Sequence, residues 1–155
     1  MASRETPATK AARAARIAFE VHEYAHDPRA ESYGREAANA LKLDPARVFK
    51  TLVVDLDGTL ATCVVPVESA LDLRALGKRA ALADRAAAER ATGYVLGGIS
   101  PLGQRKRLPT LLDESALAFE TIFVSAGRRG LELELAPDDL VRLTGARVAA
   151  VASRG

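Results

Sequence analysis

Two apolar stretches joined by a tight turn constrain the fold of this chain more strongly than any other feature. Residues 49–56 and 60–67 are rich in Val, Leu and Thr, and Asp57-Gly58 lies between them. An Asp-Gly pair in this position is typical of a two-residue β-hairpin turn, because both turn residues must adopt a positive φ. The sequence therefore predicts two neighbouring antiparallel strands.

The other elements follow from helix caps and from the period of the apolar residues. Helices or helical turns are expected over residues 7–15, 33–41, 44–45, 71–76, 84–91, 113–117 and 137–143. Further strands are expected over residues 17–24, 80–82, 121–125, 131–135 and 147–151. Hairpins dominate and β-α-β alternation is not sustained, so the expected fold class is α+β. We expect a mixed, largely antiparallel and barrel-like sheet with peripheral helices, in a single domain over residues 1–155.

Composition limits the class of protein. The chain has 155 residues, of which 48% are hydrophobic, and this is enough for one domain with a core. The net charge of +2 does not by itself indicate a partner. Cys63 is the only cysteine, so no intrachain disulfide can form, and we expect it to be buried in the core. No apolar stretch approaches the roughly 20 residues of a membrane helix, and the N-terminus lacks a signal-peptide core. We therefore expect a cytoplasmic protein without membrane contact.

The segment His22-Glu-Tyr-Ala-His26 matches the H-E-x-x-H pattern of zinc proteases. That pattern requires a helix, where the two histidines lie about 6 Å apart on one face. Here the segment alternates like a strand and Pro28 follows, which would separate the histidines by roughly 13 Å. A Zn–N bond is about 2 Å long, so one ion could not bind both. We interpret the motif as a pair of histidines at a strand end, and expect no metal and no cofactor.

Residues 53–59, Val-Val-Asp-Leu-Asp-Gly-Thr, match the first motif of haloacid-dehalogenase-type phosphatases. In those enzymes the nucleophilic Asp ends a parallel strand, and the chain then enters a loop and a helix. Here the chain enters the β-rich segment 60–65 directly. Asp138-Asp139 resembles the acidic metal-binding pair of such enzymes, but it falls in the first turn of an expected helix. The hairpin interpretation is therefore preferred.

Four polar residues in expected strands are candidates for chemistry. With a period of two, Lys50 shares a face with Leu52 and other apolar residues. It therefore lies at the open end of a cavity, or extends its ammonium from a strand end into solvent. Glu132 and Glu134 alternate with leucines, so both point to solvent or one of them faces Lys50. Ser125 precedes a glycine turn, where hydroxyls often contact ligands, but it has no evident His partner for a catalytic triad.

Residues 92–109 contain four glycines, two prolines and a basic triplet. Glycine lets a backbone pass close to a ligand, and the N–H groups of residues 97–99 could bind an anion or an oxyanion. The triplet Arg105-Lys106-Arg107 would attract phosphate. The alternative is a plain turn followed by a solvated run of charges.

Several short motifs together carry a family resemblance: Thr6-Pro7, Tyr24-Ala-His-Asp-Pro28, Val48-Phe-Lys-Thr-Leu52, Thr92-Gly-Tyr94, residues 97–104, residues 106–110, Val124-Ser125 and Arg129-Gly130. The chain resembles the YbaK branch of the YbaK/EbsC family over nearly its whole length. These proteins are free-standing aminoacyl-tRNA deacylases, related to the editing domain of many prolyl-tRNA synthetases.

The resemblance implies a trans-editing deacylase that hydrolyses the ester of mischarged Cys-tRNA(Pro). A synthetase pocket discriminates between side chains as similar in size as proline and cysteine by only about 1–3 kcal/mol, so a separate hydrolytic site is needed. The implied partners are the acceptor end of the tRNA and prolyl-tRNA synthetase. In the family the substrate's own thiol is thought to attack its carbonyl. The alternatives are a weakly catalytic or non-catalytic module that binds tRNA or synthetase, and a sibling editing enzyme with another amino-acid specificity.

The resemblance also assigns residues. The family's essential Lys corresponds to Lys50, its pocket Tyr to Tyr24, and a pocket Phe to Tyr33. The glycine-rich wall of the family pocket corresponds to residues 97–101, with Gly98 closest to the substrate. A family Asp is replaced by Glu132, which is one methylene longer.

We assign three groups of roles on this basis. Lys50 would hold the terminal adenosine or favour the substrate thiolate, and the N–H groups of Gly98 and Ile99 would bind the developing oxyanion. The expected substrate-binding residues are Tyr24, Tyr33, Gly97, Ser100, Pro101, Ser125 and Glu132. The expected contacts to tRNA phosphates are Arg105, Lys106, Arg107, Arg128 and Arg129.

Overall fold

The computed structural model describes residues 4–29 and 32–153. Its helices are α1 (Pro7–Ala14), α2 (Tyr33–Ala40), α3 (Leu73–Leu76), α4 (Arg85–Thr92) and α5 (Pro137–Thr144), with the short 3-10 helices η1 (Pro45–Arg47) and η2 (Glu114–Ala118). Its strands are β1 (Phe19–Glu23), β2 (Phe49–Leu56), β3 (Leu60–Pro66), β4 (Ala70–Leu71), β5 (Ala80–Leu82), β6 (Thr110–Asp113), β7 (Ile122–Arg128), β8 (Leu131–Leu135), β9 (Arg147–Ala149) and β10 (Ala152–Ser153). None of the helices in these residues is long and apolar enough to cross a lipid bilayer.

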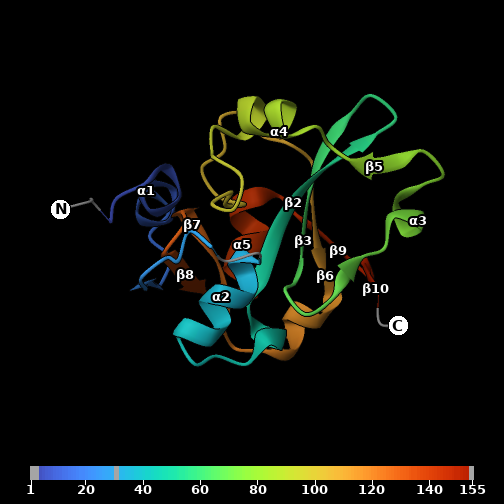
Figure 1. Ribbon diagram of the computed structural model, residues 1–155. Helices are drawn as coiled ribbons and strands as arrows, with labels where there is room; N and C mark the ends of the chain where they lie inside the picture. Colours follow the sequence, from blue (N-terminus) through green and yellow to red (C-terminus); the bar gives the residue numbers. More distant parts are fainter. Residues whose placement is uncertain (1–3, 30–31, 154–155) are drawn as a thin grey trace.

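The strands of the described residues form three sheets, and helices lie around them (Figure 1). The largest sheet has the order β5-β2-β3-β6-β9; β2 is antiparallel to β3 and β5, whereas β6 is parallel to β3 and β9. The sheet β1-β8-β7 is antiparallel throughout, and β10 pairs with β4. The predicted mixed and largely antiparallel α+β fold is therefore confirmed. The expected barrel-like closure is not found, because β5 and β9 remain the two edges of the largest sheet and the described strands form no closed barrel.

The predicted hairpin is formed by β2 and β3, which pair from Phe49 with Pro66 to Asp55 with Leu60. Both turn residues have a positive φ, 60° at Asp57 and 103° at Gly58, as a two-residue hairpin turn requires. The chain therefore returns as a strand directly after the turn. This geometry differs from the strand, loop and helix that a phosphatase motif needs.

Three segments differ from the prediction. No strand was predicted over residues 110–113, where a helical turn was expected to begin at Asp113, but these residues form β6, which pairs with β3 in parallel. The helix expected over residues 71–76 is shorter, because Asp72 caps α3 and the two residues before it pair with β10. The last predicted strand, over residues 147–151, ends at Ala149.

The main core cluster takes side chains from both larger sheets, among them Phe49, Val64, Leu131, Leu133 and Leu135. An isolated parallel bridge between Val48 and Phe123 connects the start of β2 to β7, so the two sheets are joined where β2 begins. The leucines of β8 point into this core. The alternate residues of β8, Glu132 and Glu134, lie on its other face, toward α2 and η1.

Candidate active site

A cavity of about 250 Å³ lies where α2, β2, β7, β8 and the glycine loop (residues 93–104) meet. It is lined by Ser32, Tyr33, Gly34, Phe49, Lys50, Thr51, Leu52, Leu96, Gly97, Ile99, Ser125 and Glu132. The structure thus brings together the predicted site residues Lys50, Tyr33, Gly97, Ile99, Ser125 and Glu132. A larger cavity, of about 840 Å³, lies beside η2 and is lined by none of the predicted site residues, so we place the candidate site at the smaller one.

Lys50 occupies the second position of β2, opposite Val65 of β3, and lines the cavity. Within the part of the chain that the structure describes, Lys50 has no ion-pair partner. Burial lowers the pKa of its ammonium, and the positive charge of Arg35 lowers it further. An anionic group of a ligand would relieve this cost of burial, because an opposite charge favours the ammonium form. The wall at Lys50 is therefore suited to bind an anion.

Glu132 lines the same cavity from β8, and only 6% of the residue is exposed. Burial raises the pKa of its carboxyl to about 8. Neither Oε2 of Glu132 nor Oγ1 of Thr51 has a hydrogen-bond partner among the described residues. Buried polar atoms without a partner are uncommon, and here both belong to residues that line one cavity. Of the two alternatives left open for Glu132, the structure shows the one in which it lines the cavity with Lys50, because residues of α2 and β2 cover this face of β8.

Tyr33 is placed by close packing of α2 against the hairpin. The side chain of Ser32 caps the N-terminal end of the helix, as predicted. Gly34 then lets the helix approach β3: a Cβ atom at this position would lie 2.3 Å from Cγ1 of Val67. A larger residue at Gly34 would push the first turn of α2, and Tyr33 with it, away from the cavity wall.

Three residues of the glycine loop, Leu96, Gly97 and Ile99, line the cavity, but Gly98 does not. The N–H of Gly98 donates a hydrogen bond to the carbonyl of Val95 at 2.8 Å. A Cβ atom at Gly98 would lie 2.7 Å from Cα of Arg128, so this glycine packs on the turn between β7 and β8. Gly98 therefore lies outside the lining of this cavity with its N–H already bonded, and its assigned role near the substrate stays a prediction. The role of Ile99 stays a prediction.

Ser100 and Pro101 also lie away from the cavity. Ser100 is fully buried, and its Oγ accepts a hydrogen bond from the N–H of Leu102 at 3.2 Å. Its carbonyl accepts another from the side chain of Gln104 at 3.0 Å. Pro101 lines a different cavity, of about 180 Å³. The structure therefore gives these two residues a role in shaping the loop and does not place them where a substrate in the Lys50 cavity would lie.

Tyr24 and Ser125 flank the cavity on the side of β1 and β7. Tyr24 packs on a small buried cluster, which consists of Ala37, Ala38, Val48, Val67 and Phe123. Burial raises the pKa of Tyr24 to about 12, and the nearby carboxyl of Glu132 contributes to this rise. Ser125 pairs with Glu132 across the strands, and its Oγ accepts a hydrogen bond from the N–H of Gly127 at 3.1 Å. Tyr24 is thus a neutral neighbour of Glu132 and is not among the residues that line the cavity.

The basic triplet lies away from the Lys50 cavity. Arg105, Lys106 and Arg107 are all exposed, and none of them lines that cavity. Arg107 lines the 180 Å³ cavity instead, beside the C-terminal end of α5. The triplet is therefore accessible to phosphates, but any phosphate that it binds lies outside the Lys50 cavity.

The two arginines of the β7–β8 turn are placed differently from each other. Arg128 forms an ion pair with Glu23 of β1 at 3.4 Å. The guanidinium carbon of Arg129 lies 4.3 Å from the ring centroid of Tyr33, and its nitrogens donate to the carbonyl of Leu96 at 3.0 and 2.5 Å. Arg129 therefore sits at the edge of the cavity, with two of the five N–H donors of its guanidinium bonded to Leu96.

Sequence reasoning missed two lining residues of β2, Phe49 and Thr51, and the charge of Arg35 near Lys50. A strict period of two assigns Phe49 and Thr51 to the strand face opposite Lys50. The structure places both at the cavity, because β2 begins where the two sheets meet. A hydroxyl next to Lys50 within an apolar strand was the one available signal for Thr51. Nothing in the sequence indicated that Arg35 would lie near Lys50.

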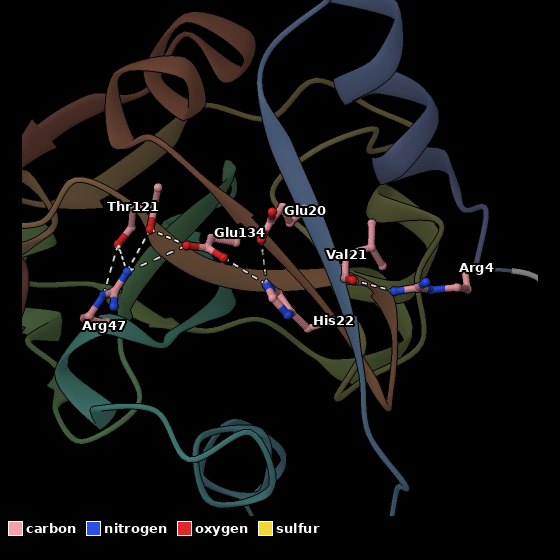
Figure 2. Close-up of polar contacts among 7 residues, drawn as sticks. All are labelled: Arg4, Glu20, Val21, His22, Arg47, Thr121 and Glu134. Carbon is pink, nitrogen blue, oxygen red and sulfur yellow. Dashed lines mark hydrogen bonds and ion pairs between the residues drawn. The ribbon is translucent and has the colours of Figure 1, made fainter.

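The two histidines of the H-E-x-x-H segment contact different carboxylates, as a strand-end pair would. His26 lies 2.8 Å from Glu36 of α2. His22 lies 2.9 Å from Glu134, whose other oxygen accepts a hydrogen bond from Thr121 at 2.6 Å (Figure 2). His22 therefore connects β1 to β8, and His26 connects the segment after β1 to α2.

One group of residues in the described chain has the geometry of a metal site: the ligand atoms of Glu20, His22 and Glu134 lie within 4.8 Å of one another. The carboxylate of Glu134 also lies 3.9 Å from the guanidinium of Arg47, and Figure 2 draws this ion pair as a dashed line. A cation there would compete with the hydrogen bonds of His22 and Thr121 and with the charge of Arg47. The chemistry of this group therefore favours an ion-pair network that holds β1, β8 and η1 together.

Comparison with known proteins agrees with this geometry. The model of the family described as aminoacyl-tRNA editing domain matches residues 27–143. A protein of Enterococcus faecalis (strain ATCC 700802 / V583), described as a candidate Cys-tRNA(Pro)/Cys-tRNA(Cys) deacylase, EbsC, is 37% identical over 123 residues, which are 76% of this chain and 75% of that protein.

Two solved structures share the fold over most of both chains. One is the hypothetical protein APE2540, with a TM-score of 0.83 and 26% identity, covering 96% of this chain and 100% of the other. The second is described as a candidate trans-editing enzyme for prolyl tRNA synthetase, with a TM-score of 0.80 and 25% identity, covering 96% and 99%.

Proposed function

The chain belongs to the aminoacyl-tRNA editing domain family of YbaK/EbsC type, and we propose that it removes cysteine from mischarged Cys-tRNA(Pro) in trans. The observation that carries this proposal is the unpaired ammonium of Lys50 beside the glycine loop, in a cavity of about 250 Å³. A cavity of this size, with an ammonium in its wall, suits a small aminoacyl group attached to the anionic sugar-phosphate backbone of a tRNA. The partners are the acceptor end of the tRNA and prolyl-tRNA synthetase, which places the reaction in the cytoplasm.

The substrate supplies its own nucleophile in this proposal. Ser125 lines the cavity, but its hydroxyl already accepts a hydrogen bond from Gly127, and neither histidine lines the cavity with it. The chain's one thiol, Cys63, is buried in β3, where burial raises its pKa to about 11. The deacylation therefore relies on the thiol of the cysteinyl ester or on water, with positioning as the main contribution of the protein.

The chemical step is an acyl transfer. The substrate sulfur, as a thiolate favoured by the charge of Lys50, attacks the ester carbonyl carbon. The C–S bond forms, the bond from the carbonyl carbon to the ribose oxygen breaks, and that oxygen leaves with a proton as the free tRNA hydroxyl. Water then hydrolyses the cyclic thioester to cysteine. Lys50 also lies where a terminal phosphate could approach, since Arg35 adds a second positive charge to the same region.

A deacylation assay on a panel of charged tRNAs tests the proposal. Cys-tRNA(Pro) should be hydrolysed well above the spontaneous rate, while Pro-tRNA(Pro) should stay intact. Cys-tRNA(Cys) belongs in the panel because the name of the Enterococcus relative includes it. Preferred hydrolysis of Ala-tRNA(Pro) would instead assign a sibling editing specificity. Binding without any hydrolysis would leave a tRNA-binding or synthetase-binding module.

A further inference from the structure

Arg129 joins separate parts of the cavity wall through one side chain. Its guanidinium stacks on the ring of Tyr33 in α2, 4.3 Å from the ring centroid. Two nitrogens of the same guanidinium donate to the carbonyl of Leu96 in the glycine loop, at 3.0 and 2.5 Å. Tyr33 and Leu96 both line the Lys50 cavity. Arg129 therefore fastens the glycine loop to α2.

The two glycines that follow Leu96 make this contact sterically possible. A Cβ atom at Gly97 would lie 2.5 Å from a ring carbon of Tyr33 and 2.7 Å from Nε of Arg129. A Cβ atom at Gly98 would lie 3.1 Å from the backbone nitrogen of Arg129. The loop, the ring and the arginine are thus packed without room for a methyl group. Displacing any one of them displaces the other two.

The turn that carries Arg129 is also attached to the residue that follows β1. The carbonyl of Gly130 accepts a hydrogen bond from the N–H of Tyr24 at 3.0 Å. Glu132 follows in β8, and the pairing of β7 with β8 shifts register between Ser125 and Arg128. The turn between these strands is therefore irregular and is held in place by its contacts on both sides.

We propose that Arg129 is a positioning residue of this site, which holds the glycine loop against α2 and keeps Leu96, Gly97 and Ile99 in place as a cavity wall. The inference rests on the proposed function, because deacylation is the reaction whose geometry the wall supports. It replaces the expectation of a phosphate contact for Arg129, since the flat face and two donors of the guanidinium are engaged with protein groups. Lysine cannot reproduce this contact, because it lacks the planar fork and the stacking face.

Two substitutions separate positioning from a phosphate contact. Arg129→Lys keeps the charge, and Arg129→Ala removes it. If Arg129 positions the loop, both variants lower kcat for Cys-tRNA(Pro) by about 10-fold or more, with KM little changed. The slope of log kcat/KM against log salt also stays the same as in the wild type. Arg79→Lys, at an exposed ion pair with Asp57 beside the β2–β3 turn, is the matched control and keeps full activity.

A phosphate contact gives the opposite pattern and would overturn the proposal. Arg129→Lys would then retain most of the activity, and Arg129→Ala would raise KM and reduce the salt slope by about 1. Thermal unfolding of each variant shows that it is folded before its kinetics are compared.

Hydrogen exchange gives a readout that does not depend on the reaction. The N–H of Gly98 is bonded to the carbonyl of Val95, so releasing the loop should increase its exchange rate. We expect about 10-fold faster exchange over residues 95–99 in both Arg129 variants without substrate, and no change in Arg79→Lys. Unchanged exchange in Arg129→Ala would overturn the positioning role. If the wild type lacks deacylase activity, the proposed function fails. The hydrogen-exchange measurement still shows whether Arg129 holds the glycine loop against α2.

Discussion

Glu132 and Glu134 lie on the same face of β8, yet their carboxyl groups have opposite pKa shifts. Burial raises the pKa of Glu132 to about 8, and its Oε2 has no hydrogen-bond partner among the described residues. Burial by itself would also raise the pKa of Glu134. Hydrogen bonds from Thr121 and His22 to the carboxylate outweigh the effect of burial, so the pKa of Glu134 is lowered. One strand thus presents an uncharged carboxyl to the cavity and an ionised one to the network beside it.

Glu132→Gln should change how stability depends on pH. Between the ordinary carboxyl pKa of 4.5 and the raised value of about 8, the folded protein binds more protons than the unfolded chain. The stability of the wild type should therefore fall as pH rises through this window, by at most about 1.4 kcal/mol per pH unit. The variant has no carboxyl to ionise, so its stability should stay flatter. Urea unfolding at several pH values compares the two, and parallel curves would contradict the raised pKa.

Glu134→Gln should have the opposite effect on stability at neutral pH. A lowered folded pKa means that the ionised carboxylate stabilises the protein above its ordinary pKa of 4.5, and that this contribution is lost as pH falls through the folded value. The variant should lose about 1.5–3 kcal/mol at pH 7, a typical contribution of a hydrogen bond to a charged group. The loss should shrink in acid. A destabilisation that stays constant down to about pH 3 would show that lost packing, and not charge, explains it.

The antiparallel hairpin and the helix caps were predictable because their causes are local. Asp57-Gly58 can adopt two positive φ values in sequence, and Ser32 caps α2 through its own side chain. The strand β6 was not predictable in this way. Residues 110–113 form a strand because they pair in parallel with β3, a contact that depends on the whole fold. The absence of a closed barrel among the described strands likewise depends on the whole fold, since β5 and β9 stay unpaired with each other at the two edges of the largest sheet.

The position of a site residue was predictable where its own chemistry restricts its surroundings, and not where the packing of distant segments determines them. Lys50 was singled out because a lysine on an apolar strand face is unusual, although the pattern alone also allowed an ammonium that extends into solvent and the family resemblance was needed to choose. Glu132 was expected at the site only through the family resemblance, since alternation on β8 alone also allows a solvent-facing carboxylate. The packing of Gly98 was not predictable for a related reason: glycine permits close approach, but the sequence does not say to which group. Here it approaches the backbone of Arg128 and not the cavity.

Removal of divalent metals should leave the deacylation rate unchanged. Glu20, His22 and Glu134 are close enough to hold an ion, but none of them lines the Lys50 cavity. Treatment with a chelator should therefore have no effect, and His22→Ala should lower stability by roughly 1 kcal/mol while activity remains. Activity that a chelator removes and zinc restores would show that a metal takes part in the reaction.

Lys50→Ala should lower kcat/KM for Cys-tRNA(Pro) by about 100-fold or more, since Lys50 is the one cationic side chain among the described residues that line the cavity. The fold should persist, because the ammonium has no ion-pair partner among the described residues whose charge would be left buried. Circular dichroism and thermal unfolding check this point. Lys78→Ala, at an exposed position between α3 and β5, is the matched control. Activity retained in Lys50→Ala would remove Lys50 from the site.

The substrate thiol should determine the rate if it is the nucleophile. Ser-tRNA(Pro) differs from Cys-tRNA(Pro) by one atom, and its hydroxyl is far less ionised near neutral pH. Its ester should be hydrolysed at least about 100-fold more slowly than the cysteinyl ester. Ser-tRNA(Pro) should nevertheless compete with the cysteinyl substrate for binding. Single-turnover rates separate the chemical step from binding. Equal rates for the two esters would instead indicate a water molecule activated by the cavity, with Lys50 and Glu132 as the groups to examine next.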